Sequence, residues 1–345
     1  MKTEAAILAE LGAPLVVDEI EIPRLKDGQV LVEVLYSGVC HTQLSEVMGL
    51  RGEDQYLPHC LGHEGTGVVV SLGSGVSKVK EGDRVLLSWI KGSGKDVPGT
   101  VYSWSGGKVN AGGITTFGKY MVISENRVSP LPDGVDEKAA ALFGCAVPTG
   151  VGVVLNTLEA KPCQSIAIFG AGGIGLCALA GAKARGCSPI IVVDRLDNRL
   201  SLALKMGADI VINALEEDPV SAMEKAVRGG VDLCVECTGA PEVMELTLRC
   251  VKARGGKVGV VGNAEFGKTI AIDPRKLNMG KQLRGTWGGD VNPDVDIPRY
   301  FEMLSLGSLD IEPLLGEEYS LSSINDALES LRKDGVGRPI INMSL

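Results

Sequence analysis

All three histidines of this 345-residue chain lie in one stretch, residues 40–67, which reads CHTQLSEVMGLRGEDQYLPHCLGHEGTG. Within it, Cys40 offers a thiol and His63 an imidazole, two ligand types that zinc favours. Glycines surround His63 and Glu64, and the apolar run at 68–70 has the pattern of a strand. This spacing predicts a zinc site whose imidazole projects from a rigid loop.

A third protein ligand is available at Cys145, in the segment FGCAVPTG at 143–150. Two thiolates and one imidazole leave the fourth tetrahedral position to water or substrate, as Lewis-acid chemistry requires. Alternatively, Cys40 and Cys145 are buried apolar thiols and His63 is a hydrogen-bonded core residue. The cofactor motif described below favours the metal-site interpretation over that of buried core residues.

Length and charge limit the class of protein. A chain of 345 residues suggests two domains of ordinary size. The formal net charge of −9, with no basic run, argues against nucleic acid as a partner. Glu4 and Glu10 interrupt what would be an apolar signal region, and no run is long enough to cross a bilayer. Nine scattered cysteines, an odd number, predict reduced thiols. We therefore expect a cytoplasmic protein with no membrane partner.

The first 130 residues or so predict a mainly-β region. Its strand-like runs lie at 14–22, 29–34, 67–70, 84–87 and 120–123. The interval 88–113 is rich in Gly and Ser and poor in periodicity, so it is predicted to be a loop over the surface or beside a cleft. From residue 136 the pattern becomes helical and leads to Cys145.

The region from residue 165 alternates strands with helices, which indicates a parallel sheet. A strand at 165–169 is followed by GAGGIG at 170–175, a helix, and a strand at 190–194 that ends in Asp194. Later strands are predicted at 210–213, 232–237, 257–261 and 282–286. The glycine motif between strand and helix, with an acid 19 residues beyond it, is a strong dinucleotide-binding signal.

Each glycine of the motif has an expected role. Gly170 permits a tight turn, Gly172 lets the backbone approach a pyrophosphate, and Gly175 lets the helix pack on the strand. Asp194 is expected to accept hydrogen bonds from a ribose diol, which predicts NAD. Arg195 beside it could pair with a 2′-phosphate, so NADP is the alternative cofactor.

The tail contains helical patterns at 296–306 and 321–332 and a strand at 339–343, too little for a separate domain. We expect it to pack on the N-terminal β region. The prediction is an α/β protein in which a Rossmann doubly wound parallel sheet, residues 150–287, is inserted in a mainly-β catalytic domain formed by 1–149 and 288–345.

Six motifs in order give the chain a clear resemblance to the zinc-dependent alcohol dehydrogenases of the medium-chain dehydrogenase/reductase superfamily. They are GVCHT at 38–42, GHEGTG at 62–67, GDRV at 82–85, GCAVPTG at 144–150, GAGGIG at 170–175 and ECTG at 236–239. The resemblance covers nearly the whole chain and implies a GroES-like catalytic domain.

The resemblance also implies roles for particular residues. Cys40, His63 and Cys145 match the catalytic zinc ligands, Thr42 the hydroxyl that takes the substrate proton, and Glu64 the acid beside the metal. The implied cofactor site comprises His41, Thr149, Gly170, Gly172, Gly173, Ile174, Gly175, Asp194, Arg195, Arg199 and Arg338, of which His41 and Arg338 match positions that contact the pyrophosphate.

Three positions depart from the family pattern. The interval 88–113 contains no cysteine, so the second, structural zinc of many relatives is expected to be absent, leaving one Zn²⁺ per chain. Gln43 replaces the aspartate that braces the histidine ligand, so the metal should be slightly more electrophilic. Ser45 replaces a histidine that ends the proton relay in some relatives, and it could hold a water.

The expected activity is reversible hydride transfer between an alcohol held at the zinc and NAD. Trp89, Ala111 and Gly112 are expected to line a roomy pocket. The charged loop at 51–54 suggests a polar or polyhydroxylated substrate, although a solvated turn explains it equally well. The alternatives are an NADPH-preferring aldehyde or ketone reductase and, more remotely, a non-catalytic dinucleotide-binding protein.

The segment KTIAI at 268–272 has the pattern of an exposed apolar edge strand. Such an edge is usually covered by pairing, and relatives pair their cofactor domains here. The expectation is a homodimer, with a tetramer as an alternative.

Overall fold

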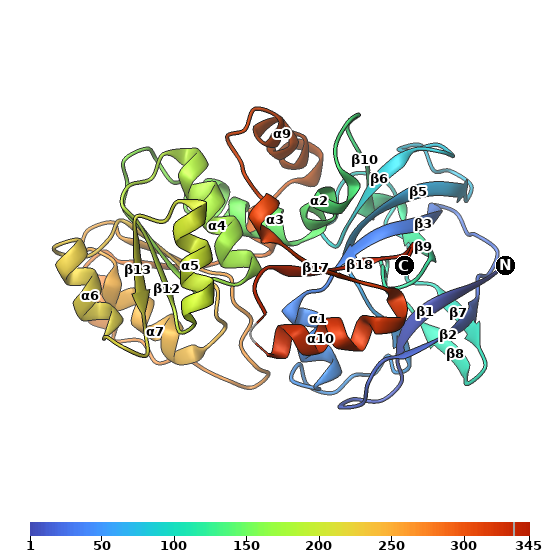
Figure 1. Cartoon of the computed structure of the whole chain (residues 1–345), viewed down its shortest axis with the longest axis horizontal. Coiled ribbons are helices and arrows are strands. Elements are labelled where there is room, and N and C mark those ends of the chain that lie inside the picture. Colours follow the sequence, from blue (N-terminus) through green and yellow to red (C-terminus); the bar gives the residue numbers. More distant parts are fainter. Residues whose placement is uncertain (334) are drawn as a thin grey trace. The chain divides into compact units, whose positions relative to one another are not determined.

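The computed structural model describes residues 1–333 and 335–345 and divides into two compact units (Figure 1). The first comprises Met1–Cys145, Asn292–Pro298 and Leu315–Leu345, and the second comprises Ala146–Val291 and Arg299–Leu314. The residues predicted as the cofactor domain, 150–287, fall within the second unit. That unit also takes in 299–314, which the prediction placed with the catalytic domain.

The first unit is built on two β structures. The larger is a seven-stranded sheet. Its strands are β10 (Val128–Pro130), β6 (Arg84–Ser88), β5 (Glu64–Leu72), β3 (Gln29–Gly38), β18 (Arg338–Asn342) and β17 (Leu315–Tyr319), in that order, with β9 (Tyr120–Ser124) also paired to β3. The other is a closed barrel of β1 (Lys2–Leu8), β2 (Val16–Glu21), β7 (Val101–Trp104), β8 (Gly107–Asn110) and β4 (His59–Cys60). Because β18 pairs with β3, the tail joins the N-terminal region as expected.

The prediction of a plain loop at 88–113 was wrong, because β7 and β8 form a hairpin there. These strands are short, and Ser103, Lys108 and Asn110 interrupt their apolar residues, so they lack the apolar runs that the sequence interpretation relied on. They hold together because Tyr102 and Val109 alternate inward and are fully buried in the core of the first unit. Strand β1 was missed as well, although its residues from Ala5 to Leu8 are buried.

Short helices connect the strands of the first unit. They are α1 (His41–Val47), η1 (Glu125–Arg127), α2 (Glu137–Ala141), η2 (Leu142–Gly144), η6 (Leu321–Ser323) and α10 (Ile324–Arg332). In α10 the buried residues Ile324, Ala327, Leu328 and Leu331 recur at helical spacing, so one face packs on the core.

The second unit contains the predicted doubly wound sheet, with six parallel strands. Their order is β13 (Ile210–Asn213), β12 (Ile190–Asp194), β11 (Ile166–Phe169), β14 (Leu233–Glu236), β15 (Lys257–Val260) and β16 (Gln282–Gly285). Each predicted strand is present. The central strands β11 and β12 are continuous apolar runs, as is typical of strands covered on both faces, whereas β16 at the edge is mostly exposed. The order reverses between β11 and β14, the point where such sheets bind ligands.

Helices accompany this sheet. They are α3 (Ala146–Gly152), the π-helix η3 (Val153–Thr157), α4 (Gly173–Arg185), α5 (Asp197–Met206), α6 (Pro219–Ala226), α7 (Pro241–Cys250), α8 (Pro274–Asn278), η4 (Gly288–Asp290), η5 (Glu312–Leu314) and α9 (Pro293–Ser305), the last of which belongs in part to each unit.

The segment at 268–272 is not a strand in this chain, contrary to the prediction. Its residues form no ladder, and the sheet ends at β16 on this half and at β13 on the other. The backbone N–H of Ala271 instead donates to Glu245 Oε1 at 2.7 Å. The apolar pattern of this segment therefore does not by itself produce a strand in the single chain.

Across residues 1–333 and 335–345, no single helix is long and apolar enough to cross a membrane; one bent pair, 137–144 with 146–157, reaches the required length and apolarity only when both parts are counted together.

Candidate metal centre and cofactor site

The structure brings together the three predicted zinc ligands, all within the first unit. One ligand atom from each of Cys40, His63 and Cys145 lies within 4.8 Å of the others, and His63 Nε2 lies 3.3 Å from Cys145 Sγ. Cys40 precedes α1, His63 lies just before β5, and Cys145 follows η2. Both thiols are buried and the imidazole is partly buried.

This donor set fits zinc. At ordinary Zn–S and Zn–N bond lengths, tetrahedral ligand atoms lie about 3.5 Å apart, close to the separation of His63 Nε2 and Cys145 Sγ. The contact between the thiols lowers the pKa of Cys40 well below its ordinary value and raises that of Cys145 well above it. Thiols this close compete for one proton, and a divalent cation can satisfy both.

Gln43 connects two of the ligands. Its Oε1 accepts a hydrogen bond from the backbone N–H of Cys40 at 2.9 Å, and its Nε2 contacts His63 Nδ1. The amide is buried and turns the Nε2 edge of the imidazole toward Cys145. Gln43 therefore occupies the bracing position that the sequence assigned to it.

Glu64 and Arg338 form a buried ion pair beside the ligands. Arg338 Nε donates to Glu64 Oε1 at 2.7 Å, and the Nη2 atom lies 2.6 Å from the same oxygen. A Cβ added at Gly38 would lie 2.3 Å from Glu64 Oε1, so a glycine there makes room for the carboxylate. Sequence reasoning assigned each residue a separate role and missed the pairing.

The predicted proton-relay residues lie on α1. Thr42 and Ser45 are three residues apart in a helical turn and are both half-buried, so they share a helix face, as the relay hypothesis requires. Of the predicted pocket residues, Trp89 packs against the core and Gly112 is exposed. The N–H of Ala111 donates to the Thr100 carbonyl at 2.8 Å, which fixes its backbone.

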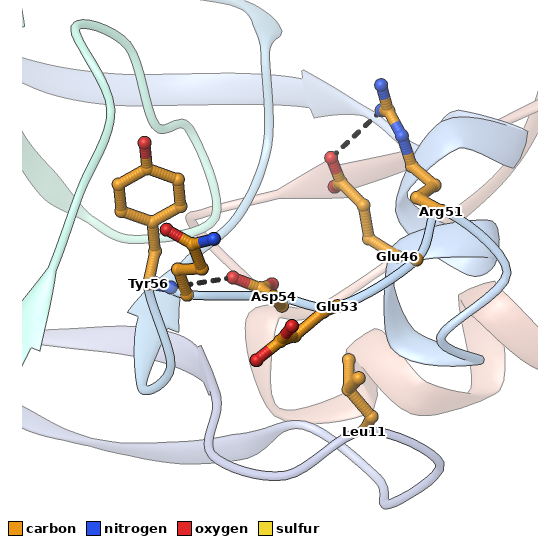
Figure 2. Close-up of a pocket in the computed structure, with 8 residues that line it drawn as sticks. Leu11, Glu46, Arg51, Glu53, Asp54 and Tyr56 are labelled. Carbon is orange, nitrogen blue, oxygen red and sulfur yellow. Dashed lines mark hydrogen bonds and ion pairs between the residues drawn. The ribbon is translucent and has the colours of Figure 1, made fainter. Parts of the chain in front are cut away.

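A polar pocket of about 370 Å³ lies beside α1 (Figure 2). It is lined by Leu11, Glu46, Arg51, Gly52, Glu53, Asp54, Gln55 and Tyr56. Arg51 Nη1 is 3.1 Å from Glu46 Oε1, and the Tyr56 N–H donates to Asp54 Oδ1 at 2.8 Å. Burial raises the pKa of Glu46, and Arg51 opposes that effect. Glu46 stands one helical turn after Thr42, a relationship that the sequence interpretation overlooked.

The glycine motif of the second unit has the geometry that its predicted roles need. Gly170 adopts φ +93°, which favours glycine. A Cβ added at Gly172 would meet nothing within 4 Å, which leaves open space at the start of α4 for an anion. A Cβ at Gly175 would lie 1.7 Å from the Gly170 carbonyl oxygen, so α4 packs closely on the turn only because this residue is glycine.

Asp194 stands at the end of β12, next to this turn. Its Oδ2 accepts from the Ala171 N–H at 2.6 Å, and its Oδ1 accepts from the Arg195 N–H at 2.7 Å. These hydrogen bonds fix the carboxylate where a ribose bound at the motif would meet it.

The other predicted cofactor residues are distributed over both units. Gly173 and Ile174 begin α4, Arg195 is exposed, and Arg199 lies on α5. Thr149 is buried in α3, and its hydroxyl has no hydrogen-bond partner among the described residues. His41 and Arg338 belong to the first unit.

Comparisons with known proteins agree with this fold and site. Residues 26–133 match the family described as alcohol dehydrogenase GroES-like domain, and 173–306 match zinc-binding dehydrogenase. The chain is 33% identical to an S-(hydroxymethyl)glutathione dehydrogenase of Synechocystis sp., over 97% of this chain and 98% of the relative. It is 32% identical to the enzyme of that name from Escherichia coli, over 99% and 100%. The crystal structure of benzyl alcohol dehydrogenase from Acinetobacter calcoaceticus superimposes with a TM-score of 0.90, at 30% identity and 99% coverage of both chains.

The fold and the site thus define an oxidoreductase that acts on CH–OH groups with zinc and NAD(P). The chain belongs to the zinc-dependent alcohol dehydrogenase family of the medium-chain dehydrogenases. Its substrates are small-molecule alcohols, and the predictions of a GroES-like region and a Rossmann sheet are confirmed.

Proposed function

We propose that this enzyme interconverts a polar alcohol and its carbonyl compound, using NAD and one catalytic zinc held by Cys40, His63 and Cys145. The convergence of two thiols and one imidazole within 4.8 Å is the observation that carries the proposal. We keep the predicted division by function, with a catalytic domain of 1–149 and 288–345 and a cofactor domain of 150–287, although residues 299–314 pack with the second unit. A metal in this site supplies a Lewis acid that makes an alcohol proton easier to remove.

The chain's own residues then orient the ligands and move the proton. The buried amide of Gln43 holds the imidazole of His63, and the pairing with Arg338 holds Glu64 beside the ligands. Thr42 takes the alcohol proton, and Ser45, one turn along the same helix face, leads it toward solvent. His41 and Arg338 are assigned to the cofactor pyrophosphate by resemblance.

The choice of NAD rests on Asp194. Its carboxylate is fixed by backbone N–H groups, so it cannot easily turn away from an added 2′-phosphate, whose negative charge it would repel. The test compares kcat/KM for NAD and NADP. Asp194→Gly should narrow or reverse the preference, and adding Arg195→Ala should then remove any gain with NADP. A wild-type enzyme that prefers NADP would refute the choice of NAD and favour the NADPH-preferring reductase alternative.

The choice of a polar substrate rests on the polar pocket beside α1. Glu46, one turn after Thr42, and its partner Arg51 present opposite charges to this pocket, an arrangement that suits hydroxyl groups on a substrate. The names of the similar enzymes above include both polar and aromatic alcohols, so they do not distinguish the two substrate classes, and we infer the class from the pocket. Arg51→Ala should raise KM for polyhydroxylated alcohols about tenfold and leave benzyl alcohol unchanged. Equal effects on both would support a solvated turn.

We also propose a cytoplasmic homodimer. All nine cysteines are free, which suits a reducing compartment. The segment at 268–272 forms no ladder in the single chain and leaves Ile270 exposed, and a second copy would supply a strand for it to pair with. The Ala271 N–H donates to Glu245 in the single chain and would turn to the partner strand in a dimer. Ala271→Pro removes this N–H, so sedimentation should show monomers, whereas a wild-type monomer at micromolar concentration would end the idea. A tetramer is the other outcome that sedimentation can detect.

A further inference from the structure

A buried carboxylate stands where the order of the cofactor-binding sheet reverses. Glu236 ends β14, the strand that pairs with β11 at the reversal, and it is 0% exposed. The glycine motif follows β11 itself, so Glu236 lies at the same edge of the sheet as the motif. No step described above uses this residue.

The side chain of Glu236 organises the turn at 237–239. Its Oε1 accepts hydrogen bonds from the Thr238 N–H at 2.7 Å, the Thr238 hydroxyl, and the Gly239 N–H at 3.1 Å. Three donors on one oxygen are typical of a carboxylate that stabilises a turn. This turn packs on the glycine motif: a Cβ added at Gly170 would lie 3.0 Å from Thr238 Cγ2.

The same residue also holds the loop that follows β15. The N–H groups of Val261 and Gly262 donate to the main-chain carbonyl of Glu236 at 2.9 and 3.1 Å, and the side chain meets the loop by packing. A Cβ added at Gly262 would lie 2.7 Å from Glu236 Oε2 and 2.1 Å from the Gly239 nitrogen. A glycine is therefore needed for the loop to approach both the carboxylate and the turn.

The two segments joined by Glu236 lie on the side of the reversal opposite Asp194. A dinucleotide spans this point, with one mononucleotide on each half of the sheet. Because Asp194 and the motif take the adenosine and pyrophosphate, the half formed by β14, β15 and β16 receives the nicotinamide.

We propose that Glu236 is a positioning residue for the cofactor: its carboxylate fixes the turn at 237–239, against which the loop at 261–263 packs, and so fixes the backbone that receives the nicotinamide half. The proposal rests on dinucleotide binding by this family. It does not depend on the choice of NAD or on the alcohol.

The test is Glu236→Gln, measured by cofactor binding. Glutamine keeps the size of the side chain but replaces one acceptor oxygen with an NH₂ donor. If the NH₂ group takes the place of Oε1, it faces the N–H groups of the turn. If it takes the place of Oε2, it is buried where the described residues offer it no acceptor. The dissociation constant of the reduced cofactor, NADH or NADPH, whichever the wild type binds more tightly, should rise about tenfold, by the loss of about one net hydrogen bond. The dissociation constant of AMP, which occupies only the adenosine half, should stay within about twofold.

Asp232→Asn is the matched control, because Asp232 precedes the same strand at its amino end. Its Oδ2 accepts from the Ser165 N–H and hydroxyl at 2.9 and 2.8 Å, far from the cofactor edge. This variant should lose thermal stability and bind both ligands as the wild type does.

Thr238→Val is the second variant. It removes a hydroxyl that donates to Glu236 and accepts from the Ala240 N–H at 3.1 Å, and because the position is exposed, the variant should fold even if Glu236→Gln does not. It should weaken reduced-cofactor binding roughly threefold. The proposal is overturned if these variants bind the reduced cofactor normally, or if AMP binding falls as much. A wild type that prefers NADPH would contradict the proposed cofactor without bearing on Glu236.

Discussion

Arg338 and Glu64 form a buried ion pair although 274 positions separate them in the sequence. Arg338 is 3% exposed and Glu64 is 0% exposed. Arg338 begins β18, which pairs with β3. The chain's last strand therefore supplies the cation that makes a buried carboxylate tolerable beside two thiols.

Removing the cation should destabilise the protein strongly. In Arg338→Leu the carboxylate of Glu64 stays buried without its partner, which typically costs about 3–5 kcal/mol. Urea unfolding of the zinc-loaded protein measures this cost. Lys138→Met is the control, because Lys138 and Glu318 form a partly exposed pair worth less than about 1 kcal/mol. Comparable losses in the two variants would show that the buried pair contributes little.

The ion pair shows what sequence patterns could and could not predict. Zinc ligands and cofactor glycines lie in short motifs, where the residue types and their spacing carry the chemistry. The pairing of Glu64 with Arg338 depends on a strand contact across the whole chain, for which a single sequence gives no signal. Glu46 and Glu236 were missed for a similar reason, since only the fold shows that one borders a pocket and the other is buried.

The metal site predicts one zinc per chain. Cys145→Ser should stay folded but lose zinc and nearly all activity, because a hydroxyl is a far poorer zinc ligand than a thiolate. Elemental analysis of the purified protein checks the metal content. Cys163→Ser, at an exposed cysteine, should keep both zinc and activity. Two tightly held zincs in the wild type, or an active zinc-free variant, would contradict this assignment.

A carboxylate organises the region that lacks the structural-zinc cysteines. Glu125 is 1% exposed, and its oxygens accept from the N–H groups of Ser77, Lys78 and Lys95 at 2.7, 3.0 and 2.8 Å. Burial by itself would raise the pKa of Glu125, but these donors outweigh it and lower the pKa below its ordinary value. The carboxylate thus ties the segments at 77–78 and 93–97 together, which the composition of the region did not reveal.

Glu125 should make stability depend on pH in the acid range. Because its pKa is lower folded than unfolded, its contribution is complete above the unfolded pKa and is lost as pH falls through the folded pKa. Glu125→Gln should therefore cost about 2 kcal/mol at pH 7 and progressively less below pH about 4. Urea unfolding at several pH values measures this. Asp96→Asn removes an exposed pair with Lys91 and should change stability by less than about 0.5 kcal/mol. If Glu125→Gln lowers the free energy of unfolding equally at every pH, the charge-based explanation is contradicted.

The final prediction concerns the path of the alcohol proton. Thr42 can receive a proton but must pass it onward, and Ser45, three residues later on α1, does not titrate near neutrality. Thr42→Ala should lower kcat on the order of 10²-fold or more, as expected for a positioned proton-transfer group, whereas Ser45→Ala should cost less than about tenfold. Steady-state kinetics of alcohol oxidation across pH measures both effects.

Replacing Ser45 with histidine separates a relay from a purely structural role of this helix turn. An imidazole titrates near neutrality, so Ser45→His should speed alcohol oxidation at low pH, where proton release is slowest, and change it little at high pH. Ser45→Asn is the control, because it adds polar bulk without a titrating group and should not produce this pH dependence. If Thr42→Ala keeps full activity, or if Ser45→His behaves as Ser45→Asn does at every pH, the proton does not leave along this face of α1.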